Sequence, residues 1–201
     1  MKPRPGASRP PGEVRITAGA LRGRKVPVAD RPGLRPTPER VRITLFNWLG
    51  QDLTGWRVLD AFAGSGALGF EAASRGAAQV VMLERDPSLL AGLQAVRQRL
   101  GVATVRVERA DALAWMRSAA PSSFDLVLLD PPFDADLALP AAEAAARLVG
   151  EGGFVYVEAP SPLDPPPPGL GVWRSGTAGA VSFQLLRVGY TAGEPTTRTE
   201  P

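Results

Sequence analysis

The residues best suited to take part in a reaction are Asp130, Pro131, Pro132 and Phe133, which follow a short apolar run at residues 126–129. Such a run is typical of a strand buried on both faces of a parallel sheet. Because proline cannot donate to a neighbouring strand, the Asp130 carboxylate and the Pro131 carbonyl are left as acceptors. Acceptors beside an aromatic ring suit a planar substrate with an exocyclic amino group, such as a nucleobase. On these residues alone, a strand-terminating turn explains the pattern equally well.

A glycine-rich loop is the second such feature. Residues 57–63 are predicted to form a strand, and the loop after it follows the pattern Gly64-x-Gly66-x-x-Gly69. Glu84 lies 20 residues beyond Gly64, where the dinucleotide-binding fingerprint places a ribose-binding acid. The literal interpretation is NAD binding. The same geometry serves any adenosine-containing cofactor, because glycines let it approach the backbone closely.

Two further acids are predicted at the same edge of the sheet. Asp111 follows the third predicted strand and is suited to hold an adenine amino group, while Asp60, ahead of the glycine loop, is suited to approach a cationic part of a cofactor. The carboxyl ends of parallel strands meet at one edge, so these acids and Glu84 should lie together. Strand-end capping explains any one of them, but three on one edge indicate a site.

The composition restricts the chemistry. Cys and His are absent, which excludes disulfides, thiol nucleophiles, imidazole catalysis and nearly every zinc site. The only lysines are Lys2 and Lys25, so the usual proton donors of hydride-transfer enzymes are scarce. Acceptors of the kind found at residues 130–133 instead suit an amine that attacks the methyl group of a sulfonium cofactor. Such a reaction requires no metal.

The charge is concentrated at one end of the chain. Residues 1–42 contain 11 Lys and Arg against 3 Asp and Glu, a net charge of +8, while the remainder has a net charge of −5. A basic, arginine-rich segment next to an acidic body favours a nucleic-acid partner over a compositional bias toward arginine. With no apolar stretch of membrane-spanning length, we expect a soluble, cytoplasmic protein.

The elements that must position these residues alternate along the chain. Strands are predicted at residues 57–63, 79–83, 104–107, 124–130 and 154–158. Helices are predicted at residues 67–75, 87–100, 113–117 and 136–149. This alternation predicts an α/β fold with a doubly wound, Rossmann-like parallel sheet. Residues 172–175 and 181–188 alternate apolar and polar side chains and predict a terminal antiparallel hairpin.

The N-terminal part has a different pattern. Residues 14–17 and 22–28 predict a small β-hairpin with basic residues on one side. Thr37 is predicted to cap a helix that has Pro38 at its first position and apolar residues at helical spacing up to Leu49. This helix should pack against the main sheet.

These motifs together resemble those of the RsmD family, the bacterial small-subunit ribosomal RNA guanine-N2 methyltransferases. The resemblance covers residues 14–190. It depends on four blocks, which are residues 22–25 (Arg-Gly-Arg-Lys), residues 34–49, residues 62–69 and residues 130–133. Many amino-group methyltransferases share the last block, whereas the first three in this order are more specific. Ile43 and Val96 depart from the family pattern.

The resemblance implies a Rossmann-like S-adenosylmethionine-dependent fold whose seven-stranded, mostly parallel sheet ends in an antiparallel strand. It implies that the cofactor is held by Asp60, Phe62, Ala63, Gly64, Ser65 and Gly66, with its ribose on Glu84 beside Arg85 and its adenine near Asp111. The target amine would bind Asp130 and Pro131, ahead of Pro132, with its base on Phe133.

The resemblance also implies a polymeric substrate, 16S ribosomal RNA within the 30S subunit or an assembly intermediate. The residues expected to grip its phosphates are Arg22, Arg24, Lys25, Arg35, Arg40 and Arg42. The predicted organisation is a disordered basic tail (1–12), an RNA-binding hairpin and helix (13–50), a methyltransferase domain (51–190) and a flexible tail (191–201).

Three other functions are compatible with these residues. The Asp-Pro-Pro-aromatic motif also serves methyltransferases that act on DNA adenine or cytosine, or on a glutamine side chain. A non-catalytic RNA-binding module would keep the same fold. An NAD oxidoreductase satisfies the glycine pattern, but the proton donors that such enzymes usually use are scarce in this chain.

Overall fold

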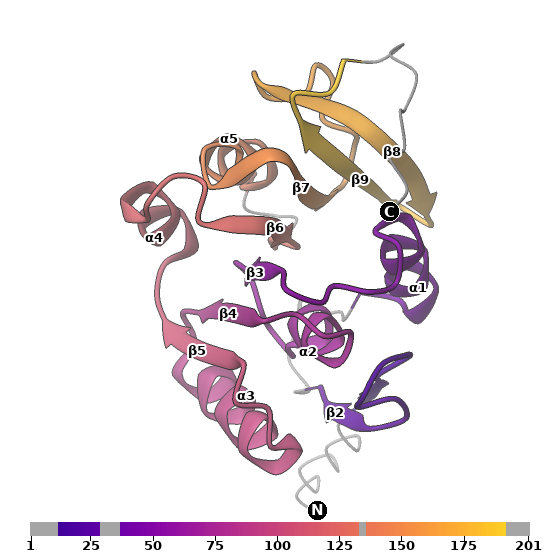
Figure 1. Ribbon diagram of the computed structural model, residues 1–201, viewed down its shortest axis with the longest axis vertical. Coiled ribbons are helices and arrows are strands. Elements are labelled where there is room, and N and C mark those ends of the chain that lie inside the picture. Colours follow the sequence, from indigo (N-terminus) through magenta and orange to yellow (C-terminus); the bar gives the residue numbers. More distant parts are fainter. Residues whose placement is uncertain (1–11, 29–36, 133–135, 192–201) are drawn as a thin grey trace, which may run out of the picture.

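The strand order of the main sheet places the glycine loop at its centre. The computed structural model of the protein describes residues 12–28, 37–132 and 136–191 (Figure 1). The sheet contains β3 (Arg57–Asp60), β4 (Gln79–Glu84), β5 (Val105–Arg109), β6 (Phe124–Leu129), β7 (Val149–Ala159), β8 (Leu170–Ala178) and β9 (Val181–Val188). Their order is β5-β4-β3-β6-β7-β9-β8. The chain therefore reverses its direction of winding between β3 and β6, where doubly wound sheets bind ligands.

All pairings from β5 to β7 are parallel, and β9 pairs antiparallel with both β7 and β8. This confirms the predicted seven-stranded methyltransferase sheet with an antiparallel terminal strand. The last strand of the chain is inserted between β7 and β8, so it is an interior strand.

Helices cover both faces of the sheet (Figure 1). They are α1 (Glu39–Trp48), α2 (Ala67–Ser74), α3 (Pro87–Leu100), α4 (Ala112–Ser118) and α5 (Ala138–Ala146). One apolar core contains side chains of α1, α2 and α3, and the other contains those of α4 and α5. Along β6, Leu126 and Leu128 belong to the first core and Val127 and Leu129 to the second. The continuous apolar run of β6 is thus explained by burial on both faces.

The N-terminal hairpin consists of β1 (Glu13–Arg15) and β2 (Lys25–Pro27), paired antiparallel as predicted. Ile16 and Val26 belong to the same core as the central strands, so the hairpin packs on the main body. The domain boundary at residue 50 stays a prediction. Apart from Gly12 and Thr191, the predicted tails at 1–12 and 191–201 lie outside the described residues.

Three boundary predictions were wrong. The strand predicted at 57–63 ends at Asp60, where the glycine loop begins its turn. The predicted helix at 136–149 ends at Ala146, because Val149 pairs with Phe124 and begins β7. Thr37 does not cap α1: the cap position is Pro38, which makes no side-chain hydrogen bond, and the Thr37 hydroxyl bonds elsewhere. None of the helices in the described ranges is long and apolar enough to cross a membrane.

Glu71 of α2 joins the hairpin and α1 to the sheet. It is fully buried, and its carboxylate forms ion pairs with Arg42 of α1 at 3.1 Å and Arg75 at 2.9 Å. The same carboxylate accepts hydrogen bonds from the Thr17 backbone N–H at 2.9 Å and the Thr17 hydroxyl at 2.6 Å. One side chain therefore fixes three separate segments.

We predict that Glu71→Gln lowers the free energy of unfolding by about 3–5 kcal/mol, because removing one partner leaves buried arginines without a counter-charge. Denaturant unfolding followed by circular dichroism measures the change. The control is Glu13→Gln, which breaks the exposed Lys25–Glu13 pair and should change stability by about 1 kcal/mol or less. Equal losses in the two variants would contradict the role assigned to Glu71.

Candidate active site

Strand register brings the predicted acids to one edge and one face of the sheet. Asp60 pairs with Leu128, and Leu128 pairs with Tyr156. Side chains of paired residues in parallel strands point to the same face, and so do those two positions further along. Asp130 and Glu158, which follow Leu128 and Tyr156 by two residues, therefore share the face of Asp60. This is the face covered by α1 and α2.

The glycine loop connects β3 to α2. Gly66 caps α2 with a φ of 80°, in the left-handed region that favours glycine. A Cβ added there would lie 2.6 Å from side-chain atoms of both Leu93 and Phe70, so a larger residue would displace the loop. The loop backbone is consequently held close to the edge where β3 ends.

Asp60 lies beneath this loop. It is buried, and its Oδ2 accepts a hydrogen bond from the Gly69 backbone N–H at 2.9 Å. Burial raises the pKa of Asp60 to about 7, with the charge of Glu84 acting in the same direction and the hydrogen bond from Gly69 opposing it. Asp60 thus supports the loop and places a titratable group behind it.

Glu84, at the end of β4, connects two turns. Its Oε2 accepts from the Gly64 N–H at 3.1 Å and its Oε1 accepts from the Asp86 N–H at 2.8 Å. Its carboxylate is therefore at the glycine loop, as the fingerprint predicts. Asp111 is exposed and caps α4 through a 2.9 Å bond from the Ala114 N–H, so one of its oxygens is engaged in the helix terminus.

Asp130 directly follows β6 and is partly buried. Its Oδ2 accepts a 3.0 Å hydrogen bond from the Thr37 hydroxyl. Burial raises the pKa of Asp130 well above its ordinary value, the charge of Glu158 raises it further, and the Thr37 bond opposes both.

Two residues beside Asp130 were not in the sequence-based site. Glu158 of β7 is 2 % exposed, and Tyr156 is fully buried and donates a 2.9 Å hydrogen bond to it. Burial raises the pKa of Glu158, while hydrogen bonds from Tyr156 and Thr37 oppose that change. An acid at the end of the predicted strand 154–158 was a usable signal for Glu158. No local pattern indicates Thr37.

The other residues predicted for the site differ in their exposure. In the predicted catalytic motif, Pro131 is buried and Pro132 is exposed. Among the other residues predicted to hold the cofactor, Ala63 is buried, Arg85 is exposed, and three are half-buried, namely Phe62, Gly64 and Ser65. Phe133 and Arg35 lie outside the described residues. Of the described residues predicted to bind RNA phosphates, four are exposed, namely Arg22, Arg24, Lys25 and Arg40.

Arg42 corrects the sequence-based interpretation. It is 1 % exposed, pairs with Glu71 and donates a 3.0 Å bond to the Arg15 carbonyl. Burial lowers the pKa of its guanidinium. It is a structural residue and is not available to phosphates.

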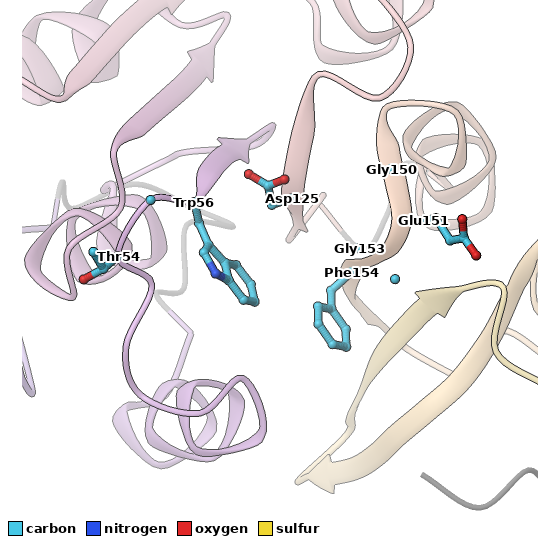
Figure 2. Close-up of a pocket in the computed structure, with 9 residues that line it drawn as sticks. Thr54, Trp56, Asp125, Gly150, Glu151, Gly153 and Phe154 are labelled. Carbon is cyan, nitrogen blue, oxygen red and sulfur yellow. The ribbon is translucent and has the colours of Figure 1, made fainter. Parts of the chain in front are cut away.

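A cavity of about 400 Å³ lies away from these acids, between the starts of β3, β6 and β7. Figure 2 shows Trp56 and Phe154 in it, together with Asp125. The two rings are nearly parallel, with centroids 6.0 Å apart. Asp125 is the second residue of β6 whereas Asp130 follows its end, so this cavity is at the opposite edge of the sheet and contains none of the predicted site residues.

Comparison with known proteins identifies the family of this chain. The family model described as "Conserved hypothetical protein 95" matches residues 14–187. The chain is 37% identical over 184 residues to "Ribosomal RNA small subunit methyltransferase D" of Escherichia coli, covering 88% of this chain and 90% of the relative. It is 40% identical over 188 residues to the Haemophilus influenzae protein of the same name, covering 88% and 94%.

The chain belongs to this family, the RsmD family. Its fold agrees with that of a solved Escherichia coli structure, provisionally titled as a methyltransferase, with a TM-score of 0.77 and 36% identity. The alignment covers 88% of this chain and 98% of that one. The chain therefore has the methyltransferase fold of the RsmD family, and Asp60, Glu84 and Asp130 lie at the carboxyl edge of its sheet.

We predict that Asp60→Asn flattens the pH dependence of stability between about pH 4 and 7. In this range the folded protein retains the Asp60 proton and the unfolded chain has released it, so the wild-type protein loses stability as pH rises. Urea unfolding at pH 5, 6 and 7 measures the slope. Asp164→Asn, at an exposed acid, is the control; parallel slopes for wild type and Asp60→Asn would contradict the prediction.

Proposed function

We propose that the protein transfers a methyl group from S-adenosylmethionine to the exocyclic N2 of a guanine in small-subunit ribosomal RNA. The observation that supports this most is the position of Asp130, an acceptor at the carboxyl end of β6 beside the glycine loop, in a chain whose relatives are named ribosomal RNA small subunit methyltransferases. The proposal includes the cytoplasm as its location and the 30S subunit or an assembly intermediate as its substrate.

The residues at this edge of the sheet suit S-adenosylmethionine. The glycine loop allows close approach to the backbone, Glu84 lies at that loop, and Asp111 keeps one carboxylate oxygen outside its helix cap. Carboxylates suit a ligand with a cationic amino-acid part, a ribose diol and an adenine amino group. When bound, the cofactor supplies an electrophilic methyl group on a sulfonium.

Asp130 and Pro131 would act on the nucleophile. The guanine amine is weakly nucleophilic because its lone pair is delocalised into the ring. Hydrogen bonds from its N–H groups to the Asp130 carboxylate and the Pro131 carbonyl would favour a pyramidal nitrogen and direct the lone pair at the methyl group. Orientation of this kind contributes on the order of 7–11 kcal/mol to a barrier. Asp130 then accepts the released proton.

We predict that Asp130→Asn lowers the single-turnover rate of methyl transfer by about 100-fold or more, because the proton acceptor is lost. The assay supplies S-adenosylmethionine with a tritiated methyl group and 30S subunits or naked ribosomal RNA, and nucleoside digestion identifies the methylated base. Cofactor affinity, measured by calorimetry, should stay within a few-fold of wild type.

The matched control is Asp125→Asn, at the other end of β6, which should retain the wild-type rate. Label in adenine, cytosine or a glutamine side chain would replace the guanine assignment. Cofactor binding without transfer to any substrate would favour a non-catalytic RNA-binding module, and tight NAD binding instead would favour an oxidoreductase.

The exposed cations of the hairpin and α1 would bind the RNA backbone. Arg22 and Arg24 lie in the turn between β1 and β2, and Arg40 lies three residues after Thr37, which contacts Asp130. The target base must leave its stack to reach Asp130, so contacts to flanking phosphates would hold the strand while the base is extruded.

We predict that Arg22→Ala with Arg24→Ala weakens RNA binding and makes it less salt-dependent, with the slope of log K against log salt reduced by about 0.7 per lost phosphate contact. Fluorescence anisotropy at several salt concentrations measures both. Arg117→Ala, an exposed arginine on α4, is the control. Equal slopes for the double variant and wild type would remove the hairpin from the interface.

A further inference from the structure

Glu158 is a buried acid that the mechanism above does not use. Leu129 pairs with Val157 in the parallel register, so the next residues, Asp130 and Glu158, are neighbours at the sheet edge. Glu158 is 2 % exposed, and the Tyr156 hydroxyl donates to its Oε1 at 2.9 Å. A buried carboxyl group next to the proposed catalytic acid, with a dedicated donor of its own, calls for a chemical explanation.

Thr37 links the two acids. Its side chain is 5 % exposed, its hydroxyl donates to Asp130 Oδ2 at 3.0 Å, and its proximity also lowers the pKa of Glu158. Thr37 immediately precedes Pro38, the cap position of α1, yet α1 has no side-chain cap. The Thr37 hydroxyl therefore does not cap the helix, as threonine commonly does at a helix start, and instead bonds to a residue 93 positions away.

We propose that Asp130 and Glu158 form a carboxyl pair that shares one proton and exchanges it through the Thr37 hydroxyl, which makes Glu158 and Thr37 positioning residues for Asp130. The sharing of the proton is a property of the free protein. Its role in catalysis rests on the proposed function.

Electrostatics favours a single proton on the pair. Two neighbouring carboxylates in a buried site repel each other, so one of them keeps its proton. Asp60 adds a third acid on the same face, and Tyr156 and Thr37 contribute the facing hydroxyl donors. The pKa values of Asp130 and Glu158 are both raised, with burial as the largest cause.

The exchange between Asp130 and Glu158 moves one proton and neither adds nor removes any. When Asp130 holds the proton, its Oδ2–H bond breaks as the proton moves to Thr37 Oγ1, and the Thr37 proton moves to Glu158. This leaves Asp130 ionised, Thr37 a neutral hydroxyl and Glu158 neutral, and in this state Thr37 donates to Asp130 as observed. The ionised Asp130 then takes the proton when the N–H bond of the methylated amine breaks.

Carbon-13 NMR of labelled side-chain carboxyl groups tests the pair in the ligand-free protein. In wild type, the Asp130 signal should change with pH in two steps, because the pair titrates together. In Glu158→Gln, which keeps the Tyr156 bond but has no charge, it should change in one step that is complete about one pH unit or more lower. Glu143→Gln, at an exposed acid of α5, is the control.

Thr37 variants test the bridge. Thr37→Val removes the hydroxyl at nearly constant shape and should raise the pKa of Asp130, because the bond that stabilises its ionised form is lost. Thr37→Ser restores a hydroxyl and should return the titration toward wild type. A merely structural role predicts the same Asp130 titration in all of these variants, and that result would overturn the proposal. Thermal melting confirms that each variant is folded.

Activity supplies a separate readout. The single-turnover rate should rise with pH as Asp130 ionises, and in Glu158→Gln this rise should move to lower pH together with the NMR transition. A rate loss of equal size at every pH, with no movement of the profile, would contradict the catalytic role. If wild type methylates no RNA, the proposed function fails, while the NMR titration still decides whether the proton is shared.

Discussion

The carboxylate of Glu71 is the contact on which the arrangement of this protein depends most. It accepts hydrogen bonds from Thr17 beside the hairpin and forms ion pairs with Arg42 of α1 and Arg75 of its own helix. These bonds fix α1 against α2, and Thr37, two residues before α1, donates a hydrogen bond to Asp130. A buried ion-pair network away from the proposed acceptor thereby anchors the helix that follows Thr37, the hydrogen-bond donor to Asp130.

The sheet and the main acids were predictable because their signals are local. A continuous apolar run identifies a strand with two buried faces, as for Leu126 to Leu129. A glycine pattern after β3 identifies a loop whose backbone must take a left-handed conformation, as at Gly66. Asp60, Glu84 and Asp130 follow from these two signals, because parallel strands place their carboxyl ends together.

The unpredicted features depend on partners distant in sequence. Arg42 has the charge and the sequence position expected of a phosphate-binding residue, but its buried ion pair with Glu71 gives it a structural role. Thr37 has the sequence of a helix cap, and only the approach of Asp130 gives its hydroxyl another partner. The end of α5 at Ala146 also depends on a distant partner. Val149 pairs with Phe124 of β6 and so belongs to a strand, which stops the alanine-rich helix before it reaches residue 149.

The insertion of β9 between β7 and β8 has a consequence for how the site is assembled during synthesis. β7 contributes Glu158, but one of its two edges is unpaired until residues 181–188 are available. The N-terminal hairpin, the glycine loop and Asp130 therefore leave the ribosome before the strand that completes the sheet around them. Glu158 pairs with Phe183 of β9, so this acid reaches its final burial only when the chain is nearly complete.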